Sequence, residues 1–228
     1  MSPRRLVPGT AAVLAAVLSL SAAELRPGHP RMFFNADTWP AVKARAEGPA
    51  KADLAKLLRK CDRYPSDPVC SGMGPVVFGE VKTASGTHRI TAATPIPPVK
   101  EWGSQAAECA LAWRFTGKPD YLAKAKRMLE VSAAAYLEAY RNGREVCWYS
   151  HSRILALCAY DWIFEALADA ERRALILPLM QHVEDTQRRD LKIVRRNTGG
   201  VNTGFYGVES LPWYAGLAAA GDGICDDR

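Results

Sequence analysis

Residues 151–167 read HSRILALCAYDWIFEAL, and this stretch decides the fold. Its apolar residues fall on every side of a helix instead of along one stripe, so the helix must be covered all round. Residues 169–187 are different, because Leu175, Leu179 and Val183 share one face while Glu171 lies elsewhere. The two stretches predict a buried inner helix followed at once by an outer helix with one apolar face.

The same alternation continues along the chain. Residues 102–116 and 203–220 are apolar almost all round, whereas residues 119–141 are amphipathic. Gly117 ends the first of these helices, and Pro178 predicts a kink in residues 169–187. The order inner, outer, inner, outer, inner predicts an all-α fold, namely an incomplete (α/α) toroid built from helical hairpins.

The segment ahead of these helices is less regular. Asp37 is a suitable N-cap for a helix to about Ala46, and a second helix is expected from about Pro49 to Lys60. Residues 63–100 are rich in Pro and Gly, which predicts a long irregular crossing with one poor hairpin from residues 75–81 and 88–92.

The lengths of the connections predict where a binding site lies. The turns at 117–118 and 168–169 are very short, whereas the connections at 142–150 and 188–201 are long. Every second connection of an up-and-down array lies at the same end, so the long ones share one rim with the entry at 95–100. Binding residues are common on such loops. The rim is predicted to carry Trp102, Trp148, Tyr149, His151, Arg153, Asn197, Asn202 and Tyr206.

The first residues read as a secretory signal. Arg4 and Arg5 precede an apolar core at 11–20, and the small residues 21–23 predict cleavage after Ala23. A retained N-terminal anchor is the alternative; no other segment predicts a membrane span. The domain organisation is therefore a signal peptide at 1–23 and a helical domain at 24–228 that is secreted or periplasmic.

Composition narrows the choice of partner. The apolar content of 48% argues against disorder, and the net charge of +6 is mild. An exported basic protein is expected to meet acidic polysaccharide or an anionic envelope surface, and no nucleic acid is expected. The sequence leaves the oligomeric state open.

Six cysteines fit no zinc spacing, so neither a metal nor another cofactor is expected. Cys61 and Cys70 flank a Pro-containing loop and are candidates for a disulfide in an oxidising compartment. Cys109 and Cys158 fall in apolar helices and are expected to be buried as small hydrophobic residues.

Three segments resemble heparinase II/III-type polysaccharide lyases. They are HPRMFF at 29–34, the pattern WYSHSR at 148–153 with AYDW at 159–162, and Asn202 with YG at 206–207 and WYAGL at 213–217. The resemblance implies an N-terminal (α/α) toroid followed by a large β-sandwich, and β-elimination on a uronic-acid polysaccharide of the heparin, heparan or alginate kind. It also implies that this chain is the N-terminal part of such an enzyme.

The resemblance gives roles to residues near the end of the chain. Asn202 loosely matches the position that neutralises the uronate carboxylate, although Thr203 stands where some members have His. Tyr206 and Glu209 are candidates for proton carrier and partner from their own spacing, one turn apart on the same predicted helix. The resemblance itself implies that the Tyr base and a partner His lie downstream of this segment. Asn202 as a helix N-cap and Tyr206 as a buried, hydrogen-bonded phenol are the structural alternatives.

The predicted substrate-binding residues have structural alternatives too. Aromatic residues at the rim either stack on sugar rings or pack beneath loops, whereas His151 and Arg153 either bind a carboxylate or, for Arg153, pair with Glu145 or Asp161. Asp161 itself is expected to be a hydrogen-bonded core residue. The basic run at 188–196 either attracts a polyanion or ends an outer helix, where cations suit the negative end of the helix dipole. These candidates are Trp102, Trp148, Tyr149, Asn197 and the basic run Arg188, Arg189, Lys192, Arg195 and Arg196.

Two other functions remain open from sequence. A glycoside hydrolase on a helical barrel needs two carboxylates in the cleft, and the rim offers Glu145 and Glu209 without a clear pairing. A non-catalytic carbohydrate-binding envelope protein would keep its affinity after loss of Asn202 and Tyr206.

Overall fold

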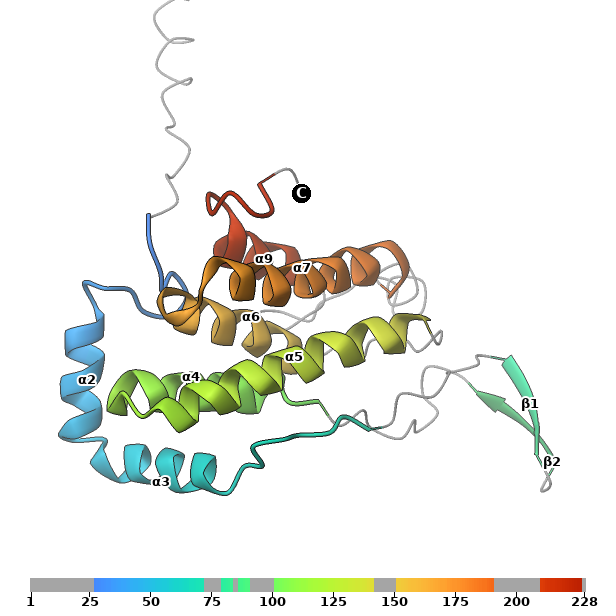
Figure 1. The fold of residues 1–228 in the computed structure, drawn as a ribbon. Coiled ribbons are helices and arrows are strands. Elements are labelled where there is room, and N and C mark those ends of the chain that lie inside the picture. Colours follow the sequence, from blue (N-terminus) through green and yellow to red (C-terminus); the bar gives the residue numbers. More distant parts are fainter. Residues whose placement is uncertain are drawn as a thin grey trace, which may run out of the picture.

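The computed structural model describes residues 27–71, 79–83, 86–90, 101–141, 151–190 and 210–226. Within these ranges the chain is predominantly helical and the helices pack against one another (Figure 1), which confirms the predicted all-α class. The α-helices are α2 (Trp39–Glu47), α3 (Lys51–Asp62), α4 (Gly103–Thr116), α5 (Pro119–Arg141), α6 (His151–Ile163), α7 (Asp169–Asp185) and α9 (Leu211–Ala219).

The helices form two rows, as the alternation of apolar and amphipathic segments predicted. In the inner row α4 packs on α6 and α6 packs on α9, while in the outer row α5 and α7 lie side by side. Ten of the 13 residues of α6 are buried, which is the covering on all sides that its apolar sequence requires. The closure of such rows into a toroid stays a prediction.

A glycine sets the distance between the two main inner helices. A Cβ atom on Gly103, the first residue of α4, would lie 2.1 Å from the backbone carbonyl oxygen of Ser152 in α6. The two helices therefore approach with their backbones nearly touching. At the other end of α4, Gly117 takes φ 68° and donates its N–H to the Trp113 carbonyl at 2.7 Å, so the predicted helix end at Gly117 is confirmed.

Two helices are shorter than predicted because their last turns change geometry. After α6 the chain forms a 3-10 turn at Phe164–Ala166, and after α7 it forms a π-helical turn at Thr186–Asp190. Helix α7 begins where Glu171 accepts the N–H of Ala168 at 2.8 Å and continues through Pro178. Of the helix predicted at 203–220, the structure describes residues 210–220, and α9 takes up Leu211–Ala219.

The N-terminal predictions are partly right. Thr38, not Asp37, is the N-cap of α2, because the side chain of Asn35 accepts the N–H groups of both Asp37 and Thr38 at 3.0 Å. The prediction of Asp37 as N-cap is therefore wrong. The predicted hairpin exists as β1 (Gly79–Thr83) and β2 (Gly86–Ile90), antiparallel with Gly79 opposite Ile90.

The cysteine predictions are also partly right. Cys109 and Cys158 are buried, as expected. The Cys61–Cys70 pair is wrong, because every cysteine in the described ranges is a free thiol. Separately, none of the helices in these ranges is both long and apolar enough to cross a membrane.

Candidate functional site

The rim that the connection lengths predicted is one end of the helical rows. Helices α4 and α6 begin, and α5 and α7 end, toward the right of Figure 1. The long connections 142–150 and 191–209 follow from α5 and α7 in the chain. The scaffold therefore gathers at one end the helix termini from which these connections start.

A buried polar cluster lies beneath this end, and we call Glu101, Tyr136, Arg153 and His182 the rim cluster. The Arg153 guanidinium lies 5.1 Å from the centre of the Tyr136 ring. The His182 ring stacks on the same Tyr136 ring, with 4.6 Å between the ring centres. Arg153 also forms an ion pair with Glu101 at 2.8 Å, with side-chain exposures of 7% and 12%. Helices α5, α6 and α7 thus each place one ring or cation in the same small volume.

The Tyr136 phenol is held in its protonated form. Its residue is 1% exposed, and burial raises its pKa above the ordinary value, with the Glu101 carboxylate adding to the rise. A phenol in this state does not take a proton from a substrate at neutral pH. We therefore assign Tyr136 to positioning Arg153 and His182, and not to proton transfer.

Trp102 lies at the rim but is buried. Its indole N–H donates to the Val69 carbonyl at 3.1 Å, its backbone N–H donates to the Ser132 hydroxyl at 3.1 Å, and 7% of the residue is exposed. The Tyr64 ring meets the indole edge-on at 6.4 Å. These contacts match the packing alternative for Trp102 more closely than stacking on a sugar ring.

His151 and Arg153 start α6 on opposite faces. Arg153 points inward, is buried and forms an ion pair, but its partner is Glu101 and not the predicted Asp161. The other predicted partner, Glu145, lies outside the described residues. His151 is exposed on the first turn. Of the two, His151 is the residue placed to meet a ligand at the rim.

The remaining predicted site residues lie outside the described residues. They are Trp148, Tyr149, Arg195, Arg196, Asn197, Asn202, Tyr206 and Glu209, together with Glu145 and Lys192.

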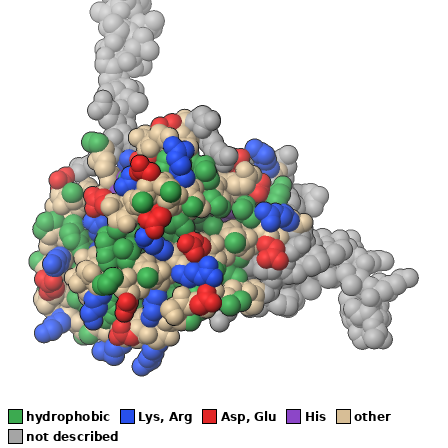
Figure 2. All heavy atoms as spheres, viewed as in Figure 1, with side chains coloured by type: hydrophobic (Ala, Val, Ile, Leu, Met, Phe, Trp, Pro, Cys, Tyr) green, Lys and Arg blue, Asp and Glu red, His purple; other side chains and the backbone are tan. Residues whose placement is uncertain are grey.

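The charges on the face shown in Figure 2 do not form a basic tract. Lys, Arg, Asp and Glu are interspersed there. Lys126 pairs with Glu171 at 2.6 Å, and Arg127 pairs with both Asp67 and Glu130. At the start of the predicted basic run, Arg188 pairs with Glu184 at 3.1 Å. A polyanion would therefore find little net charge on this face.

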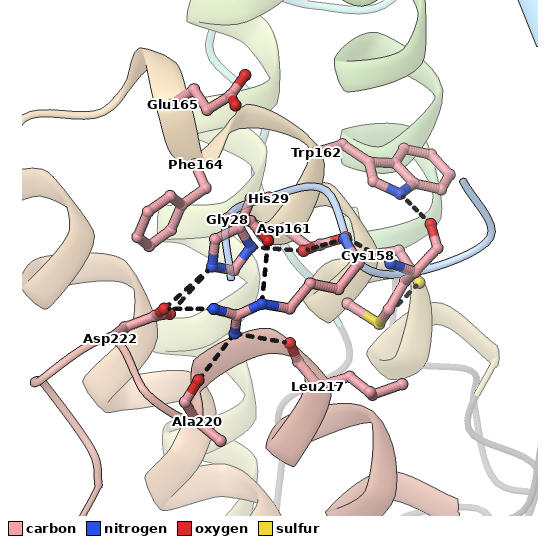
Figure 3. Close-up of polar contacts among 12 residues, drawn as sticks. Gly28, His29, Cys158, Asp161, Trp162, Phe164, Glu165, Leu217, Ala220 and Asp222 are labelled. Carbon is pink, nitrogen blue, oxygen red and sulfur yellow. Dashed lines mark hydrogen bonds and ion pairs between the residues drawn. The ribbon is translucent and has the colours of Figure 1, made fainter. Parts of the chain in front are cut away.

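A second buried polar cluster escaped the sequence analysis, and we call His29, Arg31, Asp161 and Asp222 the N-terminal clasp (Figure 3). Asp161 accepts from the Nδ1 of His29 at 2.6 Å and from the backbone N–H groups of Arg31 and Met32 at 3.0 and 2.9 Å. Asp222 pairs with the Nε2 of His29 at 3.1 Å and the Nη2 of Arg31 at 2.9 Å. The clasp joins the N-terminal segment, α6 and the segment after α9.

The N-terminal clasp has a structural role. Burial lowers the pKa of His29, but the hydrogen bonds to Asp161 and Asp222 outweigh it and hold the pKa above its ordinary value. Both ring nitrogens face carboxylates, and Phe164 covers the ring at 3.8 Å. No nitrogen is left to meet a substrate, so the clasp is an anchor despite its His–Asp pair. The one signal in the sequence was Asp161 itself, a charge in an apolar helix that needs partners.

Comparisons with known proteins give no relative. No family model matches the chain, and neither a curated protein nor a solved structure is similar to it. Among the described residues, no group of three or more His, Cys, Asp and Glu side chains is arranged to hold a metal ion.

Proposed function

We propose that the chain is an exported protein that binds a uronic-acid polysaccharide across the rim and takes part in cleaving it by β-elimination. One observation carries the proposal: the helix termini next to the amide-, aromatic- and cation-rich segments all gather at one end of the scaffold, with His151 exposed among them. The resemblance of these segments to heparinase II/III-type lyases supports the same chemistry.

The reaction divides the work between several groups. A base removes the proton at C5 of the uronate, the C4–O bond breaks, a C4–C5 double bond forms, and the leaving oxygen takes up a proton. The proton at C5 is weakly acidic while the adjacent carboxylate keeps its charge, so a donor to that carboxylate stabilises the developing enolate. We assign this contact to His151 and Asn202, and proton transfer to Tyr206 with Glu209.

Arg153 acts indirectly in this scheme. Its charge is balanced by Glu101 at 2.8 Å and its side chain is 7% exposed, so it holds the first turn of α6 in place instead of meeting the polymer. Glu101 is likewise committed to Arg153. The carboxylates that a glycoside hydrolase would use, Glu145 and Glu209, lie outside the described residues, so hydrolysis remains the alternative function.

The test is to incubate the purified protein with heparan and alginate polymers and follow the ultraviolet absorbance of the unsaturated product. We expect the absorbance to rise with wild type, and kcat/KM to fall by about tenfold or more in His151→Gln, which loses a hydrogen bond to a charged group. Lys43→Gln, which removes an exposed cation from α2, serves as the control and should leave turnover unchanged.

Other outcomes would contradict the proposal in part or whole. New reducing ends without ultraviolet absorbance would show hydrolysis. Salt-sensitive binding without turnover would favour the carbohydrate-binding alternative or an N-terminal part of a lyase that lacks its catalytic residues. Failure to bind either polymer would refute both.

A further inference from the structure

Helix α9 carries an exposed indole that the rim described above does not use. Within the part of the chain that the structure describes, three large apolar side chains are exposed, namely Phe33, Val69 and Trp213. Trp213 lies in the first turn of α9, with 59% of the residue exposed. Its neighbour Tyr214 is 1% exposed and meets the indole edge-on at 4.9 Å. The two rings therefore lie on different faces of the helix, and the indole faces away from the core.

The uncovered face of α9 is apolar and its side chains are small. Residues three or four apart share a face of a helix, so Trp213, Gly216 and Ala220 lie along one stripe. Trp213 and Ala220 are exposed and Gly216 is half-buried, whereas the opposite side of the helix holds the buried residues Leu211, Tyr214, Ala215, Ala218 and Ala219. No residue from 211 to 220 carries a charge. A ligand on this stripe therefore meets an indole beside small side chains, with no ionic group of α9.

Trp213 lies on the rim side of α9. At the other end of this helix, Arg31 of the N-terminal clasp donates to the carbonyl oxygen of Ala220 at 2.9 Å (Figure 3). Asp161, near the end of α6, belongs to the same clasp, so α6 and α9 pack side by side and both run from the rim to the clasp. Trp213 precedes Ala220 by about 10 Å of helix, and helical side chains lean toward the start of their helix. The indole therefore leans toward the rim.

We infer that Trp213 is a sugar-stacking residue at the edge of the rim, where it holds the apolar face of one pyranose ring of the bound polysaccharide. The inference rests on the proposed function, because it names a further contact of the same glycan. The axial C–H groups of a pyranose ring form an apolar face that packs on an aromatic ring while the hydroxyl groups stay in water. The uncharged stripe suits this neutral part of the sugar, whereas the uronate carboxylate is assigned to His151 and Asn202.

The size of the stripe decides between a sugar and a protein partner. A stable protein–protein contact takes about 800 Å² of surface from each partner. One indole buries at most about 250 Å², and the small side chains of Gly216 and Ala220 add little. A single sugar ring needs no more than one face of the indole. A pyranose therefore fits the stripe, and a second copy of the chain does not.

Calorimetric titration of the full chain with alginate and with heparan tests the contact. We expect Trp213→Ala to raise the Kd about tenfold, and Trp213→Phe, which keeps a smaller ring, to raise it about two- to threefold. Because stacking involves no ion pair, each ratio to wild type should be the same at low and at high salt. Phe33→Ala is the matched control. Phe33 is 60% exposed but lies beside Trp162 near the clasp end of α6, so its replacement should leave the Kd unchanged.

Fluorescence supplies a second readout that does not depend on Trp213→Ala. The chain has six Trp residues, and the difference between wild type and Trp213→Phe isolates the signal of Trp213. We expect bound polymer to shield this signal from quenching by acrylamide. The Tm of Trp213→Ala should stay within about 2 °C of wild type, because the side chain lies opposite the buried face of α9.

Three results would overturn the inference, and they separate it from the proposed function. Equal Kd values for wild type and Trp213→Ala, with binding intact, would refute the stacking contact alone. No binding of either polymer by wild type would refute the proposed function and this inference with it. Shielding of the Trp213 signal that rises with protein concentration and needs no polymer would show that a second copy of the chain covers α9.

Discussion

Replacing Asp161 by asparagine removes a buried charge from the N-terminal clasp with almost no change in shape. The carboxylate accepts from the imidazole of His29 and from the backbone N–H groups of Arg31 and Met32. An asparagine has one acceptor oxygen in place of two, and its NH₂ group would face an N–H donor. The cations His29 and Arg31 would then share the single carboxylate of Asp222.

The magnitude follows from the burial of the clasp. The side chains of Asp161, His29 and Asp222 are 0%, 1% and 5% exposed, so solvent does little to compensate the lost charge. Removing one partner of a buried ion pair costs about 3–5 kcal/mol. For a chain of this size about 1 kcal/mol corresponds to roughly 2–4 °C in Tm, so we expect Asp161→Asn to lower the Tm by about 6–20 °C.

Thermal unfolding followed by circular dichroism at pH 6 measures this loss, with Asp67→Asn as the matched control. Asp67 is 78% exposed and pairs with Arg127 at the surface, so its replacement should cost less than about 1 kcal/mol. A Tm for Asp161→Asn within about 2 °C of the control would refute the argument. It would mean that the clasp does not hold the N-terminal segment to α6.

Further predictions concern pH, packing and unpaired hydroxyls. Because the folded-state pKa of His29 is raised, its contribution to the free energy of unfolding is complete below about pH 6.5 and is lost as pH rises through the folded pKa. The free energy of unfolding of wild type, measured in urea, should therefore fall over that pH interval. An equally steep fall in His29→Gln would contradict this origin. Gly103→Ala should lower the free energy of unfolding by about 3 kcal/mol, because the new Cβ would lie 2.1 Å from a carbonyl oxygen. Gly216→Ala, whose Cβ would meet nothing within 4 Å, should raise it by about 0.5–1 kcal/mol. Equal Tm values for the two variants would overturn the packing argument. Tyr121→Phe, which loses a hydrogen bond to Asp62 at 2.6 Å, should cost about 1.5 kcal/mol in denaturant unfolding. Tyr160→Phe should be neutral or stabilising, since no described residue pairs with that buried hydroxyl, and a loss as large as that of Tyr121→Phe would reveal a partner.

The order of the helices was predictable because it depends on patterns within single segments. A helix that is apolar on every side must lie inside, and α6 does so with ten buried residues of 13. The end of α6 was not predictable. The apolar pattern continues through Phe164, whose ring turns to stack on His29 at 3.8 Å, and this contact comes from the far end of the sequence.

The pairings between distant residues were the part that the sequence could not specify. Asp161 was expected to be a hydrogen-bonded core residue, and it is, but its partner His29 lies 132 positions away. Arg153 was expected to be in an ion pair, yet Glu101 becomes its neighbour only because α4 and α6 share the inner row. Cys61 was matched with Cys70 by nearness along the chain, whereas both are free thiols and Cys70 donates to the Val131 carbonyl at 3.5 Å. For the two charged residues, the residue type indicated that a partner was needed, and the packing of the helices determined which residue it was.

The two buried polar clusters lie near opposite ends of α6. Helix α6 carries one charged residue near each end, with Arg153 in the rim cluster and Asp161 in the clasp, about 12 Å apart along the axis at the usual helical rise. The clasp fixes the end where both described chain termini meet α6, so the opposite end does not have to supply that stability (Figure 3). Long connections can therefore start from the rim and carry polar and aromatic residues without destabilising the helices beneath them. Under the proposed function, changes in the clasp should lower the Tm without altering glycan binding. Changes at His151 should alter glycan binding while the Tm stays constant, and a shared effect at both ends would show that the two clusters are coupled through α6.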